Sequence, residues 1–113
     1  MKYALLIFPK PDSYEGLTEE EQQAHSAEYY ALREEPEFID GAHLQPIHTA
    51  TTVRAGNGNG SLLTTDGPFA DTKEAFAGYY VVDVPDLDRA LELAGRIPAV
   101  RLGGAVEVRP LVY

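Results

Sequence analysis

The sequence predicts an α+β domain in which an antiparallel sheet carries two helices on one face. Two segments with helix-start signals, at Thr18 and at Asp86, indicate the helices. Short apolar and β-branched runs on either side of them indicate the strands. With 113 residues, 44% hydrophobic and 24% charged, the chain has the composition of one globular domain, which we expect to span residues 1–113.

The expected strands follow one another along the whole chain. Residues 3–8 are continuously apolar and end before Pro9, a pattern typical of a strand covered on both faces. The alternating Gly and Asn residues at 56–60 favour a hairpin turn between two later strands. The expected strands span residues 3–8, 38–44, 49–54, 61–65, 78–84 and 105–112.

The first helix is expected from Thr18 to the residues before Pro36. The segment Thr18-Glu19-Glu20-Glu21 has the form of a capping box, and its acidic residues suit the positive end of the helix dipole. Small side chains recur along one stripe, which favours close approach to a sheet. We therefore expect this stripe to face the sheet: Ala24, Ala27, Glu28 and Ala31, with Leu32 at its edge.

The second helix begins at Pro85-Asp86 and is expected to run to Ile97, where Pro98 ends it. With both helices placed, the element order is β-α-β, a hairpin insertion, then β-α-β. This order is the split βαβ pattern of a ferredoxin-like fold. The residues of the second helix that we expect to face inward are Leu87, Ala90, Leu91 and Ala94.

The composition excludes several classes of partner and site. Nine Lys and Arg against 18 Asp and Glu give a formal net charge of −9, and such a surface repels nucleic acids and anionic membranes. The chain has no cysteine, which excludes disulfides and a cysteine nucleophile and fits a cytoplasmic location. The apolar run at the N-terminus is too short for a signal peptide or a membrane span.

The segment from Asp66 to Glu74 reads DGPFADTKE and resembles the signature of the DGPF family, part of the wider YCII-related group. This resemblance implies a ferredoxin-like protomer that pairs sheet to sheet as a dimeric α+β barrel. Further segments are similar to the same family, so that the resemblance extends along the whole chain: residues 2–7, Leu44-Gln45-Pro46, Gly78-Tyr79-Tyr80 and residues 106–110.

The YCII-related group is associated with a histidine on a helix that pairs with a downstream aspartate. By this resemblance His25 takes the first role, whereas the segment Arg96-Ile97-Pro98-Ala99 contains no aspartate. Asp71 is a further departure, because the family pattern has Glu there.

Asp66 has two interpretations. In the structural one, Asp66, Gly67 and Pro68 form a turn, and Phe69 anchors the loop in apolar surface. In the functional one, Asp66 lies at the mouth of a cleft as an acid, a base or a ligand carboxylate. Phe69, Lys73 and Glu74 are then ligand-binding residues beside it.

The three histidines are His25, His43 and His48, and none forms a metal-spaced pair, so no metal site is expected. His25 is either a half-buried surface residue or a proton-transfer group. His43 alternates with Gly41 on a strand and is placed to point into a cavity on the sheet face. Imidazole and carboxylate groups are therefore the candidates for proton transfer.

Two adjacent tyrosines, Tyr79 and Tyr80, must point to opposite faces of their strand, so one packs under the helices and the other reaches the uncovered face. Packing is the structural interpretation, and Tyr79 is a candidate ligand-binding residue in the functional one. Glu107 and Arg109 share a face of the last strand. There they either line a cavity, with Arg109 binding a ligand, or form an ion pair at a dimer seam.

Two functions are open at this point. The first is a lyase or isomerase that needs no cofactor and acts on a small oxygenated compound; Asp66 or His25 moves the proton, and Lys73 or Arg109 holds an anionic group. The second is a non-catalytic ligand-binding or regulatory module linked to transcription. We also expect a homodimer, because residues 3–8 are apolar on both faces and the helices cover only one.

Overall fold

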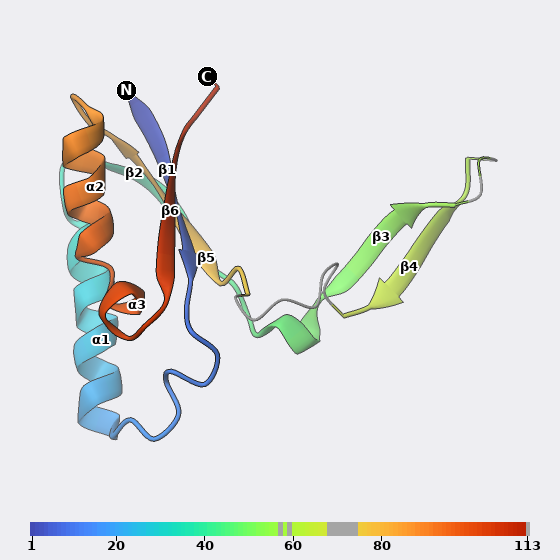
Figure 1. The fold of residues 1–113 in the computed structure, drawn as a ribbon, viewed down its shortest axis with the longest axis horizontal. Coiled ribbons are helices and arrows are strands. Elements are labelled where there is room, and N and C mark those ends of the chain that lie inside the picture. The colour runs from blue at the N-terminus through green and yellow to red at the C-terminus, as the bar shows by residue number, and fades with distance from the viewer. Residues whose placement is uncertain (57, 59, 68–74, 113) are drawn as a thin grey trace.

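The computed structural model describes residues 1–56, 58, 60–67 and 75–112 (Figure 1). Its element order is the predicted one, with a hairpin between two β-α-β halves. The elements are β1 (Lys2–Phe8), α1 (Glu19–Arg33), β2 (Phe38–His43), η1 (Ile47–Thr49), β3 (Thr51–Ala55), β4 (Leu62–Asp66), β5 (Gly78–Asp83), α2 (Leu87–Gly95), α3 (Pro98–Arg101) and β6 (Ala105–Pro110).

The main sheet has four strands in the order β2-β5-β1-β6, and every neighbouring pair is antiparallel. The helices α1, α2 and α3 lie on one side of this sheet (Figure 1). Strands β3 and β4 form a separate two-stranded sheet that projects from the body as an arm. This arrangement confirms the predicted α+β fold of the ferredoxin-like type.

The core lies between the main sheet and the helices. On β1 the side chains of Tyr3, Leu5 and Ile7 are buried, and the residues between them are less so, as period-two alternation requires. Leu5 pairs across the sheet with Tyr80 and Val108. Burying a side chain such as Leu5 stabilises the fold by about 1.5–3 kcal/mol. Residues from the helices complete the core: Leu32, Ala90, Leu93, Ala94, Ile97 and Ala99.

The predicted inward stripe of α1 is wrong. The capping box at Thr18 is present, but the alanines of the stripe, Ala24, Ala27 and Ala31, are exposed. Leu32 is buried instead, and Tyr29 packs against the core. A leucine and a tyrosine bury far more apolar area than alanines, so the helix is rotated to bring them to the sheet.

The second helix is also rotated from the prediction. Leu87 and Leu91 are 47% and 50% exposed, whereas Ala90 and Ala94 are buried as expected. Leu93 completes the buried stripe, and Ile97, between α2 and α3, is buried as well. Leu91 lies about 100° around the helix from Ala90, which places it at the edge of that stripe. The helix ends at Gly95, and Pro98 begins the short helix α3.

The other face of the main sheet has no covering element among the described residues. Two cross-strand rows lie on it: Leu6 pairs with Tyr79 and Glu107, and Ala4 pairs with Val81 and Arg109. The apolar members of these rows are half-buried, and Glu107 and Arg109 are exposed. We call this surface the open face.

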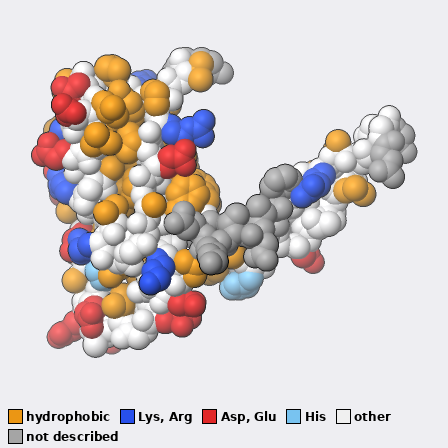
Figure 2. All heavy atoms as spheres, viewed as in Figure 1, with side chains coloured by type: hydrophobic (Ala, Val, Ile, Leu, Met, Phe, Trp, Pro, Cys, Tyr) orange, Lys and Arg blue, Asp and Glu red, His pale blue; other side chains and the backbone are white. Residues whose placement is uncertain are grey.

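The arm stands clear of the body in the space-filling view (Figure 2). Its apolar side chains Val53, Leu62 and Leu63 are exposed. The same view shows acidic and basic side chains spread over the body, without one large patch of basic residues. None of the helices in the described parts of the chain is long and apolar enough to cross a membrane.

Candidate functional site

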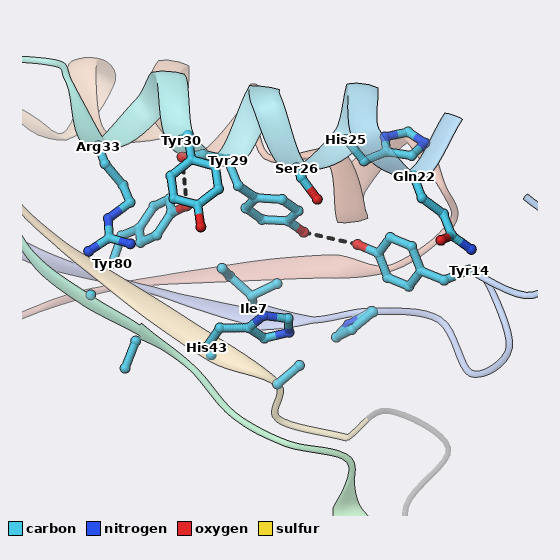
Figure 3. A pocket seen from close by; sticks show the side chains of 15 residues that line it. Ile7, Tyr14, Gln22, His25, Ser26, Tyr29, Tyr30, Arg33, His43 and Tyr80 are labelled. Carbon is cyan, nitrogen blue, oxygen red and sulfur yellow. Dashed lines mark hydrogen bonds between the residues drawn. The ribbon is translucent and has the colours of Figure 1, made fainter. Parts of the chain in front are cut away.

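A cleft with a volume of about 370 Å³ lies between α1 and the β2–β5 end of the main sheet (Figure 3). One wall is a single face of α1, because its lining residues recur at intervals of three and four, as one side of a helix requires. These residues are Gln22, His25, Ser26, Tyr29, Tyr30 and Arg33. The helix thus presents a polar and aromatic stripe to the sheet along most of its length.

The opposite wall comes from the sheet. Ile7, Gly78 and His43 form one cross-strand row on the helix-facing side, and all three line the cleft. Gly78 places no side chain between the other two, and a Cβ there would lie 2.6 Å from the carbonyl oxygen of Ala42. Gly41 in the next row also lacks a side chain, and a Cβ there would lie 2.6 Å from Cδ1 of Tyr80. Two glycines therefore open the sheet side of the cleft.

Three tyrosines connect the walls of the cleft. The hydroxyl groups of Tyr14 and Tyr29 are 3.0 Å apart, and the hydroxyl of Tyr80 donates to the backbone oxygen of Tyr29 at 2.9 Å. The Tyr14–Tyr29 pair has two O–H donors and uses one between its members, so the other can donate elsewhere. The pair therefore offers a hydrogen-bond donor at this end of the cleft.

The buried Tyr80 and the half-buried Tyr29 are held in the neutral form. Burial, together with the hydrogen bond to Tyr14, raises the pKa of Tyr29 far above its ordinary value. Burial likewise raises the pKa of Tyr80 to about 12, although the nearby Arg33 opposes the change. Near neutral pH these phenols donate hydrogen bonds and do not act as bases.

His25 is contacted by Arg101, which does not line the cleft. Nη2 of Arg101 lies 3.3 Å from Nδ1 of His25, and the same guanidinium nitrogen pairs with Glu28 at 2.5 Å. A guanidinium group has donors only, so Nδ1 must accept in this contact. In the neutral ring the proton is then on Nε2, which makes Nε2 a donor. The ring of Tyr14 packs edge-on against His25, with ring centroids 6.2 Å apart.

His43 differs from His25 in its surroundings. It is the last residue of β2, is exposed, and lines the sheet side of the cleft (Figure 3). Within the described parts of the chain its ring has no hydrogen-bond partner. Its nitrogens are therefore available to a ligand.

The structure brings two of the predicted site residues together and leaves others apart. His25 and His43 line the cleft from opposite walls. Tyr79 and Arg109 lie on the open face, where Nε of Arg109 is 3.9 Å from Glu107. Asp66 ends β4 at the base of the arm, is exposed, and does not line the cleft. The predictions for Phe69, Lys73 and Glu74 fall outside the described residues.

Sequence reasoning missed most of the α1 wall. Gln22, Ser26, Tyr29, Tyr30 and Arg33 were not singled out, although they share the helical spacing of His25. That spacing of polar and aromatic residues was the available signal. In the described parts of the chain no group of three or more His, Asp or Glu residues is arranged to hold a metal ion.

A family model, that of the YCII-related domain, matches residues 1–112. The chain belongs to the YCII-related family. An uncharacterized protein of Rhizobium meliloti (strain 1021) is 32% identical over 118 residues, covering 98% of this chain and 92% of the relative. The family model confirms the resemblance to the YCII-related group.

Among solved structures, one neighbour is 5-chloro-2-hydroxyhydroquinone dehydrochlorinase (TftG) from Burkholderia phenoliruptrix AC1100, in complex with 2,5-dihydroxybenzoquinone. The match has a TM-score of 0.54 at 16% identity and covers 100% of this chain and 95% of the neighbour. At this identity the likeness shows that the two proteins share a fold.

Proposed function

We propose that this YCII-related protein binds a small oxygenated compound in the α1 cleft and catalyses proton transfer there without a cofactor. The observation that supports this most directly is that His25 and His43 line one cleft from opposite walls. The cleft volume of about 370 Å³ lies at the small end of the usual range for ligand pockets. A compound of one ring is of suitable size.

The two imidazoles have different roles in this proposal. His43, which has no hydrogen-bond partner in the described chain, is the base that takes a proton from the ligand. His25 carries its proton on Nε2 and donates a hydrogen bond to a ligand oxygen without giving up this proton, and the proton that His43 has taken is returned from His43. The remaining O–H of the Tyr14–Tyr29 pair stabilises negative charge on a second oxygen. In an isomerase the proton returns to a different atom, and in a lyase a leaving group departs with the electron pair.

The structural neighbour supports a lyase-type reaction on a hydroxylated ring. Its name states a dehydrochlorination, and its ligand is a dihydroxylated quinone. A dehydrochlorination removes a proton and a chloride, so it needs a base and no redox partner. A cleft with two imidazoles and neutral tyrosines supplies these groups.

We also propose that the protein is a homodimer that pairs through the open face. Leu6, Tyr79 and Val81 are apolar or aromatic and uncovered in the single chain, and a second copy of the same face covers them isologously. The ion pair between Glu107 and Arg109 then lies at the seam.

A titration with 2,5-dihydroxybenzoquinone tests the binding site. We expect heat of binding with the natural chain and at least tenfold weaker binding when His25→Gln and His43→Gln are combined. His48→Gln is the matched control, because His48 is an exposed histidine outside the cleft. Equal binding by all three proteins would place the site elsewhere.

The alternative is a ligand-binding module without turnover, and one observation favours it. None of the described residues that line the cleft is a carboxylate, and the contact of His25 is an arginine. A carboxylate partner is the usual device that strengthens a catalytic imidazole. The two functions differ in one outcome, namely whether a bound ligand exchanges its carbon-bound protons.

A further inference from the structure

Arg33 lines the cleft from the last turn of α1. It lies at the end beside Tyr80, away from Tyr14 (Figure 3). It is eight positions after His25, which corresponds to about 12 Å along the helix axis. Arg33 is the only Lys or Arg among the described residues that line the cleft.

The contacts of Arg33 differ from those of other arginines in this chain. Arg89 and Arg96 form ion pairs with Glu35, and Arg101 pairs with Glu28. Arg33 has no ion pair with a carboxylate in the described parts of the chain. Its guanidinium carbon lies instead over the rings of Phe38 and Tyr30, at 5.6 Å and 6.0 Å from the centroids.

A cation–π contact holds a guanidinium group beside aromatic rings without using its hydrogen-bond donors. The guanidinium group has five N–H donors, which lie in its plane. The two rings thus hold the side chain in place, and its N–H groups stay available to a ligand. A carboxylate or an enolate accepts two parallel hydrogen bonds from such groups.

The distribution of charge also favours binding of an anionic group at Arg33. The protein carries a formal net charge of −9, so its overall field repels anions. Among the described residues that line the cleft, Arg33 is the one Lys or Arg and the cleft has no carboxylate, so an anionic ligand is attracted to Arg33. The neutral Tyr29 and Tyr80 beside it add no opposing charge.

We propose that Arg33 anchors an anionic group of the ligand, and that the ligand is a single-ring acid. The inference rests on the proposed binding function of the cleft and names its substrate class. The anionic group, a carboxylate or an ionised enol, pairs with Arg33. The hydroxyl or carbonyl groups at the other end of the ring reach the Tyr14–Tyr29 pair and His25. Proton transfer then takes place between these ends, beside His43.

The test is calorimetric binding of matched acids and amides. The probes are 2,5-dihydroxybenzoate with 2,5-dihydroxybenzamide, and 4-hydroxybenzoate with 4-hydroxybenzamide. For the natural chain we expect each acid to bind at least tenfold more tightly than its amide. In Arg33→Gln this preference is expected to vanish while amide affinity changes less than about twofold. Arg33→Lys keeps part of it, because lysine supplies charge without the planar pair of donors.

Arg96→Gln is the control, since Arg96 is a half-exposed, ion-paired arginine outside the cleft. It should keep the acid preference in full. If acids and amides bind equally well to the natural chain, the anion inference is overturned and the binding cleft stands. If acids are preferred equally by the natural chain and Arg33→Gln, another cation holds the anion. If neither series binds at millimolar concentration, both the inference and the proposed single-ring site are overturned.

Discussion

The same strands form both faces of the main sheet, yet the two faces differ in burial and in the side chains that they present. The helix-facing side buries Tyr3, Leu5 and Tyr80 and widens into a cleft where glycines replace side chains. The open face alternates half-buried apolar residues with the charged pair Glu107–Arg109. On the helix-facing side the polar groups line the α1 cleft. On the open face the charged pair lies beside uncovered apolar residues. This difference separates the candidate chemistry from the candidate assembly surface.

Adjacent leucines on β1 give the largest expected contrast. Leu5 faces the helices and is 1% exposed, whereas Leu6 faces the other way and is half-buried. Leu5→Ala should lower the free energy of unfolding by about 2–5 kcal/mol, as expected for a core truncation. Leu6→Glu should leave the folded chain intact but place a charge in the proposed dimer seam.

Light scattering and urea unfolding measure the two effects. We expect a mass near twice 12.4 kDa for the natural protein and near 12.4 kDa for Leu6→Glu. A natural protein that runs at the monomer mass at micromolar concentration would contradict the pairing through the open face. A small loss of stability in Leu5→Ala would contradict the placement of the core.

Two glycines give the next contrast. A Cβ at Gly78 would lie 2.6 Å from the backbone oxygen of Ala42, whereas a Cβ at Gly95 would meet nothing within 4 Å. Gly78→Ala should therefore destabilise the protein by about 1–3 kcal/mol. Gly95→Ala should stabilise it by up to about 1 kcal/mol, because Gly is a poor helix former. Thermal unfolding of both variants checks the difference, and a Gly78→Ala protein as stable as the natural one would contradict the close approach of Gly78 to the backbone oxygen of Ala42.

Asp66 gives a smaller effect on stability, and its two interpretations differ in the effect on function. If Asp66 caps a turn, Asp66→Ala should cost about 1 kcal/mol and Asp66→Asn less. If it is a functional carboxylate, Asp66→Asn should lose ligand binding or turnover while fold and dimer remain intact. Because Asp66 does not line the α1 cleft, we predict the first outcome for 2,5-dihydroxybenzoquinone, and loss of its binding in Asp66→Asn would contradict this prediction. Full affinity and rate in Asp66→Asn, with only a lower melting temperature in Asp66→Ala, would make the motif a structural corner.

The smallest change in stability is expected at Arg101. Its pairs with Glu28 and His25 are half-exposed, so Arg101→Gln should change the free energy of unfolding by at most about 1 kcal/mol. The informative readout is the tautomer of His25, followed through the nitrogen shifts of its ring by NMR. In the natural chain the neutral ring should be protonated on Nε2, and in Arg101→Gln a mixture of tautomers should appear. A mixture already present in the natural chain would show that Arg101 does not set the tautomer.

The order of helices and strands along the chain, and the caps of the helices, were predictable because they depend on local sequence signals. Thr18 and Asp86 cap the helices as predicted, and alternation on β5 correctly separated Tyr79 from Tyr80. The rotation of each helix was not predictable in the same way. The alanines of α1 and its large residues form rival stripes, and only contact with the sheet decides between them in favour of Tyr29 and Leu32.

The candidate site was predicted only in part for a similar reason. His25 and His43 were found as residue types suited to proton transfer, and Gly41 drew attention to the face that His43 occupies. Arg33 was missed, because an arginine near the end of a helix ordinarily stabilises the helix dipole. Its role in the cleft depends on the rings of Tyr30 and Phe38, which come together only in the fold.

The central claim is that His43 moves a proton in the α1 cleft, and exchange of ring protons tests it most directly. The probe is 2,5-dihydroxybenzoquinone in heavy water, whose carbon-bound ring protons are followed by NMR with and without protein. We expect the natural chain and His48→Gln to accelerate loss of this signal equally, and His43→Gln to be slower by about 10²–10⁴-fold, as for the loss of a general base. Binding without any acceleration by the natural chain, or full acceleration by His43→Gln, would contradict the account.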